Sequence, residues 1–172
     1  MTFTTDSSQN RLFNSFNYPA QPGDVVAGAI ALFRNLSIDD KLAVLWFVYT
    51  EMGSFITPAA TGAARLQLTA GLLNKIKQMS HDEQLQVMRD LVANKNTQFS
   101  RSYGVFSPNT KLAFWYELAQ LMDQAVVIPI PEGYKLSRDG SQALKTIRDL
   151  EFSQQITVLR KTVVDMGVDI IG

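Results

Sequence analysis

Apolar residues recur every three or four positions along most of this chain, with polar residues between them. That spacing places the apolar side chains on one face of a helix, whereas a half-buried strand needs strict alternation. No run of alternating β-branched residues is flanked by hairpin turns, so a sheet has little support. The pattern predicts an all-helical protein with helices at 24–35, 38–53, 58–79, 81–94 and 108–125, a short helix near 98–105, and one or two more between 141 and 168.

Helix-capping residues stand where these helices are expected to begin. Ser80 precedes Glu83 by three positions, which is the spacing of a capping box. Ser107 stands before Pro108, and the first turn of a helix tolerates proline. Other expected starts are at Asp24, at Ser37 and at Thr57-Pro58. Between 127 and 134 two prolines hold the chain extended, so this stretch is predicted to be an irregular connector between two halves.

Both tryptophans lie in two of these helices, each within one turn of a tyrosine. Aromatic rings offer large rigid surfaces and methionine fills irregular gaps, so such stripes would suit a long, flat apolar ligand. The same pattern is typical of an ordinary packed core, and periodicity alone does not separate the two interpretations. The stripes consist of Leu42, Leu45, Trp46, Tyr49 and Met52 in the first helix and Leu112, Trp115, Tyr116, Ala119 and Met122 in the second.

Composition narrows the function classes. The 172 residues are enough for one domain, and 16 Lys and Arg balance 16 Asp and Glu, so no overall field attracts nucleic acid or an anionic membrane. Cysteine is absent, which excludes disulfides and thiolate metal sites, and a cytoplasmic location is therefore expected. No stretch approaches the about 18 apolar residues of a membrane-spanning helix, so a span is not expected.

The residues that catalysis usually needs are scarce. His81 is the single histidine, which excludes histidine metal clusters and Ser-His triads. Its position in the first turn after Ser80 predicts an exposed helix-start residue rather than a general base. The sequence also has no glycine-rich phosphate loop. We therefore expect neither an enzyme nor a metal site.

One arginine has an unusual setting near the end of the chain. Arg160 lies beside Ile156 and Val164, on a helix whose other face is apolar. Such an arginine can lay its stem along an apolar groove and offer its guanidinium group to a partner. A solvated arginine paired with a neighbouring acid is the alternative interpretation.

Four long motifs together resemble the N-terminal, carotenoid-binding domain of the orange carotenoid protein of cyanobacteria. They are LWFVYTEMG (45–53), SPNTKLAFWYELAQLM (107–122), IPIPEGY (128–134) and QQITVLRKTVVDMG (154–167), in the family's order and spacing. Within this family the chain looks like a helical carotenoid protein, a stand-alone paralogue of that domain. The resemblance implies two interleaved four-helix bundles forming one compact domain, with a carotenoid tunnel between them. It also implies an N-terminal extension at 1–20, the helical domain at 21–172, and no C-terminal regulatory domain.

The family's pigment-contact positions can be carried over by the matching motifs. The resemblance implies a bound ketocarotenoid, canthaxanthin first and echinenone or hydroxyechinenone as alternatives. The aromatic positions that stack on the pigment correspond to Trp46, Tyr49, Trp115 and Tyr116. The other positions that line the tunnel correspond to Leu42, Met88, Met122, Ile130, Ile156 and Thr157.

The resemblance also implies a function and partners. The expected function is photoprotection, with singlet oxygen quenched by the bound pigment. Arg160 corresponds to the family's arginine that contacts the phycobilisome antenna, although Thr61 and Lys161 replace a proline and an asparagine that the family commonly has nearby. The alternatives are a phycobilisome-docking quencher at the thylakoid surface and a carrier that delivers pigment to a separate regulatory-domain homologue. A monomer or a weak homodimer is expected. Outside the family, a helical scaffold with a solid aromatic core remains as an interpretation.

Overall fold

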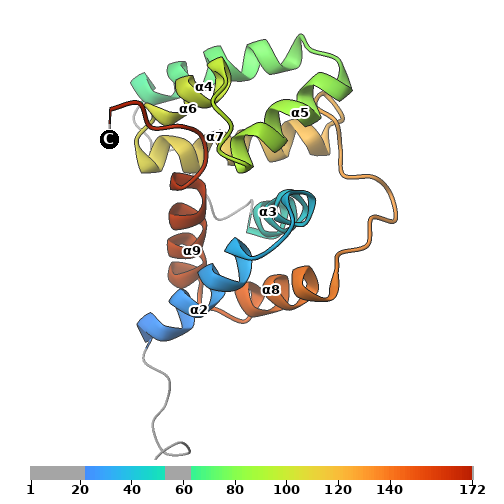
Figure 1. Cartoon of the computed structure of the whole chain (residues 1–172), viewed down its shortest axis with the longest axis vertical. Coiled ribbons are helices and arrows are strands. Elements are labelled where there is room, and N and C mark those ends of the chain that lie inside the picture. The colour runs from blue at the N-terminus through green and yellow to red at the C-terminus, as the bar shows by residue number, and fades with distance from the viewer. Residues whose placement is uncertain (1–21, 53–62, 172) are drawn as a thin grey trace, which may run out of the picture.

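A computed structural model describes residues 22–52 and 63–171, and within these residues every regular element is a helix (Figure 1). The all-helical prediction is therefore confirmed. The helices are α2 (Pro22–Arg34), α3 (Ile38–Met52), α4 (Ala63–Lys77), α5 (His81–Val92), α6 (Gln98–Gly104), α7 (Pro108–Asp123), α8 (Arg138–Arg148) and α9 (Phe152–Val164).

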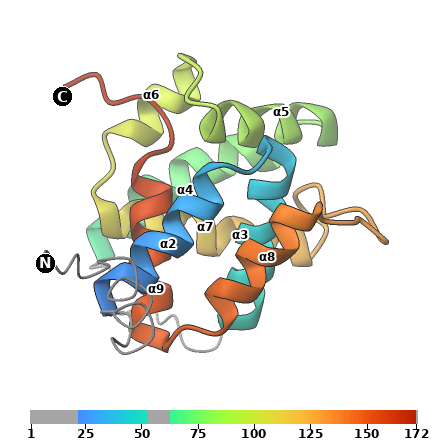
Figure 2. The ribbon, with the colours of Figure 1, turned by 60° about the horizontal axis from the view of Figure 1, so that its bottom comes forward.

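These helices form two interleaved bundles. α2, α3, α8 and α9 make one bundle, and α4 to α7 make the other, so the second bundle is inserted into the chain of the first. Figure 2 shows α2 crossing α9, with α8 beside α3. α3 lies at the junction, because it packs against α8 of its own bundle and against α5 and α7 of the other. Residues on α3 can therefore face both bundles.

Local signals in the sequence explain most helix starts. Ser80 and Glu83 form the predicted capping box, with the Ser80 amide donating to Glu83 Oε2 at 2.8 Å and the Glu83 amide donating to Ser80 Oγ at 3.2 Å. Ser107 caps α7 ahead of Pro108, as predicted. His81 is exposed in the first turn of α5, which agrees with its predicted role as a helix-start residue.

Two helix boundaries differ from the prediction. α2 begins at Pro22, so Asp24 lies inside the first turn, where its charge complements the helix dipole, and is not the N-cap. The first helix after 137 begins at Arg138 rather than near 141, because Ser137 accepts a hydrogen bond from the Gly140 amide at 3.0 Å. The predicted extension at 1–20, the start at Thr57-Pro58 and the departure at Thr61 lie outside the described residues.

The connector between α7 and α8 is irregular, as predicted, and is attached at both ends. Near α7, the Ile128 amide donates to Gln84 Oε1 at 2.8 Å, and Gln84 Nε2 donates to the Val126 carbonyl at 3.3 Å. Near α8, the buried carboxylate of Asp40 accepts the Tyr134 hydroxyl at 2.9 Å and the Ser137 amide at 3.2 Å. The connector is thus held against α5 on one side and α3 on the other.

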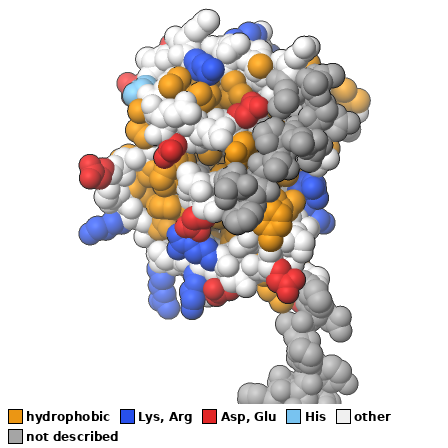
Figure 3. Space-filling model, turned by 180° about the vertical axis from the view of Figure 1, so that it is seen from behind, with side chains coloured by type: hydrophobic (Ala, Val, Ile, Leu, Met, Phe, Trp, Pro, Cys, Tyr) orange, Lys and Arg blue, Asp and Glu red, His pale blue; other side chains and the backbone are white. Residues whose placement is uncertain are grey.

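No helix among the described residues combines the length and the apolar character that crossing a membrane requires. On the face shown in Figure 3, acidic and basic side chains are interspersed, and hydrophobic side chains reach the surface between them.

Candidate functional site

The aromatic stripes of α3 and α7 meet at the junction between the bundles. Tyr49 of α3 is 2% exposed and Trp115 of α7 is 3% exposed, so these two side chains are buried at the junction. Met88 of α5 completes the wall, buried to 1% exposure. Together these helices enclose a narrow cavity of about 10 Å³. Its lining is Leu42, Leu45, Trp46, Tyr49, Met88, Trp115, Ala119 and Met122.

A second cavity, of about 100 Å³, lies next to the first and shares Leu42, Met88 and Met122 with it. Its outer wall is the connector, which contributes Ile130 and the two neighbouring prolines. The two cavities lie side by side between α3, α5, α7 and the connector, and together they are called the path below. Seven of the ten residues predicted to contact a pigment line this path: Leu42, Trp46, Tyr49, Met88, Trp115, Met122 and Ile130.

Hydrogen bonds fix the buried rings on this path. The Tyr49 hydroxyl donates to the Leu112 carbonyl at 3.0 Å. Trp115 Nε1 donates to the Tyr103 hydroxyl at 3.0 Å, and that hydroxyl donates to the Val163 carbonyl at 2.6 Å. Burial raises the pKa of both tyrosines, so both are neutral donors at ordinary pH. The polar ends of the rings are satisfied by protein groups, which leaves the ring faces for apolar contact.

Trp46 differs from the other rings. Its indole packs edge to face on Phe47, with ring centroids 5.1 Å apart. Its Nε1 atom is buried and has no hydrogen-bond partner among the residues that the structure describes. A buried donor without a partner costs about 1–3 kcal/mol, so such groups are uncommon in native proteins and need an explanation. An acceptor on a bound ligand would satisfy this one.

Three predicted contact residues do not appear among the described lining of these two cavities. Tyr116 and Ile156 are partly buried against the core, and Gln120 donates to the Tyr116 hydroxyl at 2.9 Å. The Thr157 hydroxyl donates to the Ser153 carbonyl of its own helix at 3.0 Å. The prediction for these three residues therefore gains no support from the cavities.

Arg160 is partly exposed on α9 and is positioned by α7. Its Nε donates to Asn109 Oδ1 at 3.1 Å, near the start of α7.

Lys111, two residues after Asn109 on α7, was not predicted to have a role. Lys111 is 6% exposed, its Nζ donates to the Val164 carbonyl at 3.2 Å, and it lies 5.2 Å from the centroid of the Tyr103 ring. Burial lowers the pKa of Lys111.

Further residues around the cavities were also missed. Arg89 and Asp39 form an ion pair at the edge of the second cavity, and Tyr134 lies beside them. Periodicity gives no signal for such partners, because they come from different helices and meet only in the fold.

A third cavity, of about 520 Å³, lies elsewhere between α3, α8 and α9, and its described lining is Val48, Glu51, Met52, Ile147, Arg148, Phe152 and Gln155.

Comparison with known proteins identifies the family. A family model described as "Orange carotenoid protein, N-terminal" matches residues 20–169, which include both helical bundles. The chain belongs to this family. The prediction made from its motifs is therefore confirmed.

Two relatives show the extent of the similarity. The chain is 66% identical to an "Orange carotenoid-binding domain-containing protein" of Nostoc sp. (strain PCC 7120), over 98% of each chain. It is 47% identical to the "Orange carotenoid-binding protein" of Limnospira maxima, covering 98% of this chain and 52% of the relative. The chain thus spans about half the length of that relative.

Solved structures agree with this assignment. The Orange Carotenoid Protein of Anabaena (Nostoc) sp. PCC 7120, binding canthaxanthin, matches with a TM-score of 0.80 and 45% identity, over 94% of this chain and 51% of that one. The Red Carotenoid Protein of the same organism, also binding canthaxanthin, matches with a TM-score of 0.71 and 40% identity, over 83% of this chain and 97% of that one.

Proposed function

We propose that this chain is a photoprotective protein that binds a ketocarotenoid along the path between its two bundles and has no catalytic activity of its own. The observation that carries the proposal is the meeting of Trp46, Tyr49 and Trp115 with two buried methionines around one apolar path. Two related structures bind canthaxanthin, which supports a ketocarotenoid as the ligand. When bound, the pigment supplies a conjugated polyene that takes up the energy of singlet oxygen and releases it as heat.

The residues present fit a ketocarotenoid. Apolar walls suit a polyene, and the buried Nε1 of Trp46 offers a donor for a keto oxygen. Cavities for ligands of drug size measure about 300–1,000 Å³, whereas this path holds about 100 Å³ and 10 Å³ in its two parts. Side chains must therefore move apart on loading. Met88 and Met122 are suited to this, since an unbranched thioether changes rotamer readily.

The first test is the visible absorption spectrum of the protein purified from bacteria that make canthaxanthin or echinenone. A red-shifted pigment band that co-elutes with the protein is expected. A colourless, well-folded protein would contradict pigment binding and favour a helical scaffold with a solid aromatic core.

A second measurement tests photoprotection. Pigment-loaded protein should shorten the decay of singlet-oxygen phosphorescence more than the same protein without pigment.

Two ring substitutions sharpen this test. Trp46→Leu removes a ring from the path, whereas Phe99→Leu removes a half-buried ring of α6 that is outside the lining of both cavities. We expect Trp46→Leu to lower the pigment-to-protein ratio or shift the band, and Phe99→Leu to leave both unchanged. Equal effects of the two changes would argue against the assigned path.

A second function, docking on phycobilisomes from the cytoplasm, is proposed for the Arg160 surface. Arg160 is partly exposed and Asn109 orients its guanidinium group, so it is accessible to a partner. Loaded protein should lower phycobilisome fluorescence in a salt-sensitive way, and Arg160→Leu should abolish the effect while Arg34→Leu, on α2, should not.

Pigment transfer to a regulatory-domain homologue is tested by mixing pigment-loaded protein with the pigment-free homologue and following the absorbance. Light scattering would distinguish a monomer from a weak homodimer.

A further inference from the structure

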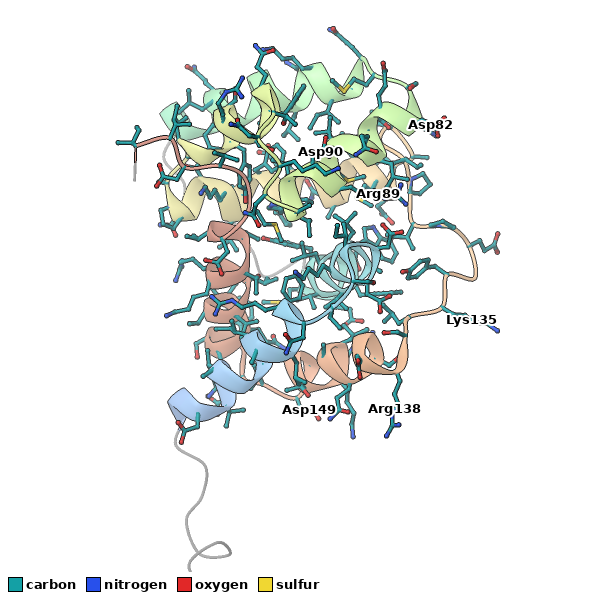
Figure 4. The ribbon with its side chains drawn as sticks, viewed as in Figure 1. Asp82, Arg89, Asp90, Lys135, Arg138 and Asp149 are labelled. Atoms are coloured by element: carbon teal, nitrogen blue, oxygen red, sulfur yellow. The ribbon has the colours of Figure 1, made fainter. Side chains whose placement is uncertain are left out.

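An ion pair joins the two bundles where the path between them reaches the surface. Arg89 of α5 donates from Nε to Asp39 Oδ1 at 2.9 Å and from Nη2 to Asp39 Oδ2 at 3.0 Å. Figure 4 shows Arg89 on the side of α5 that faces α3. Two parallel hydrogen bonds fix the plane of a guanidinium group, so its position is well defined although the two side chains are 40% and 47% exposed.

This pair also lines the cavity of about 100 Å³ below the connector. The rest of its described lining is apolar, apart from Tyr134. A guanidinium group carries five N–H donors, and the bonds to Asp39 use two of them. The Tyr134 hydroxyl already donates its proton to Asp40. Arg89 is therefore the main source of hydrogen-bond donors at this end of the path.

On the basis of the proposed function, we infer that the pair formed by Arg89 and Asp39 recognises an oxygen on the end ring of the bound carotenoid. A keto oxygen accepts hydrogen bonds from Arg89. A ring hydroxyl accepts from Arg89 and donates to Asp39. A hydrocarbon ring does neither, and its approach removes water from the guanidinium donors without replacing it. The pair thus selects oxygenated carotenoids over hydrocarbon carotenoids.

The charge balance of the pair makes this arrangement suitable for an apolar ligand. An unpaired cation at the cavity would hold water strongly and oppose the entry of a polyene. Asp39 neutralises Arg89 and leaves its other donors available, so the site is polar without a net charge.

The test is a competition between canthaxanthin and β-carotene, which differ in the oxygens of their end rings. The full chain is offered equal amounts of both pigments, and the bound pigments are extracted and separated by chromatography. Because the hydrogen bond is charged but partly exposed, we expect the wild type to favour canthaxanthin about tenfold, equivalent to about 1.4 kcal/mol. Arg89→Met, which keeps an apolar stem, should reduce this preference to about twofold or less.

Matched variants separate recognition from general damage. Arg34→Met breaks a more exposed ion pair, with Asp165, away from the path, and should keep the wild-type preference. Arg89→Lys keeps the positive charge but replaces the planar guanidinium group by one ammonium group, so it should give an intermediate preference. This variant provides the test if Arg89→Met does not fold. An unchanged preference in folded Arg89→Met or Arg89→Lys would overturn the inference about this ion pair but would leave the proposed function standing. A wild type that binds neither pigment would overturn the proposed function instead.

Discussion

At the scale of single residues, the Tyr103 hydroxyl links α6, α7 and α9 through two buried hydrogen bonds. Tyr103→Phe would leave the buried Trp115 Nε1 without this partner, which costs about 1–3 kcal/mol, whereas the Val163 carbonyl keeps the bond that it accepts from the Met166 amide at 3.3 Å. We expect urea unfolding to show a loss of stability in that range. Tyr116→Phe, at a partly exposed ring, should cost about 0.5 kcal/mol or less. Equal stabilities of the two variants would contradict this role of Tyr103.

Buried tyrosines also predict how stability depends on pH. Burial raises the pKa of Tyr49, whereas an unfolded tyrosine ionises near pH about 10. Above that pH the unfolded state releases a proton that the folded state retains, so the contribution of Tyr49 is complete below pH about 10 and is lost as the pH rises toward the folded pKa. The free energy of unfolding should fall by about 1.4 kcal/mol per pH unit for each such tyrosine.

Tyr49→Phe should make this slope shallower by about 1.4 kcal/mol per pH unit in urea unfolding between pH about 10.5 and 12, above the unfolded pKa of tyrosine. Phe47→Leu, on the same helix, removes no titrating group and should leave the slope at the wild-type value. If both variants keep the wild-type slope, Tyr49 is not the group responsible.

The sequence was more informative about which residues face inward than about which residues bond to one another. Helical spacing identified Trp46, Tyr49 and Trp115, because each lies on the apolar face of its helix. Tyr103, Asp39 and Arg89 were missed, since their roles depend on partners that lie far away in the sequence. The orphan Nε1 of Trp46 could also be found only in the folded structure.

At the scale of elements, the attachment of the connector to α3 depends on one close approach. A Cβ atom at Gly140 would lie 2.7 Å from Asp40 Oδ2, the carboxylate that also holds Tyr134 and Ser137. Alanine normally stabilises a helix by about 1 kcal/mol relative to glycine. Here the extra methyl group would displace Asp40 from its hydrogen bonds, so the sign of the effect should reverse.

We expect Gly140→Ala to destabilise the protein by about 1–3 kcal/mol and to loosen the wall that the connector gives to the second cavity. Gly71→Ala on α4 is the matched control, because a Cβ there meets nothing within 4 Å, and it should stabilise by up to about 1 kcal/mol. Thermal unfolding followed by circular dichroism measures both. A stabilised Gly140→Ala variant would show that Asp40 adjusts without losing its partners.

Capping chemistry explains which helix boundaries could be predicted. The starts of α5 and α7 follow from Ser80 and Ser107, whose side chains bond to amides three residues further on. The start of α8 was placed too late because Gly140 in the first turn disguises the cap at Ser137. That glycine is required by the close approach of Asp40, which is a tertiary contact.

At the scale of the whole molecule, the path for the pigment is built from both bundles. α3 and the connector supply one side, and α5 and α7 supply the other. A rigid ligand lying between them contacts helices that are distant along the chain. Binding to the folded state alone should therefore stabilise the junction of the bundles as well as the residues that touch the pigment.

Pigment-loaded protein is accordingly expected to resist unfolding more than pigment-free protein of the same chain. A ligand at one hundred times its dissociation constant adds about 2.7 kcal/mol, which should raise the urea midpoint clearly. Tryptophan fluorescence provides a second readout, since Trp46 and Trp115 both line the path and should be quenched when the pigment lies beside them. The comparison needs apoprotein from the same host without the carotenoid genes. Equal midpoints with unquenched fluorescence would place the pigment on the surface rather than between the bundles.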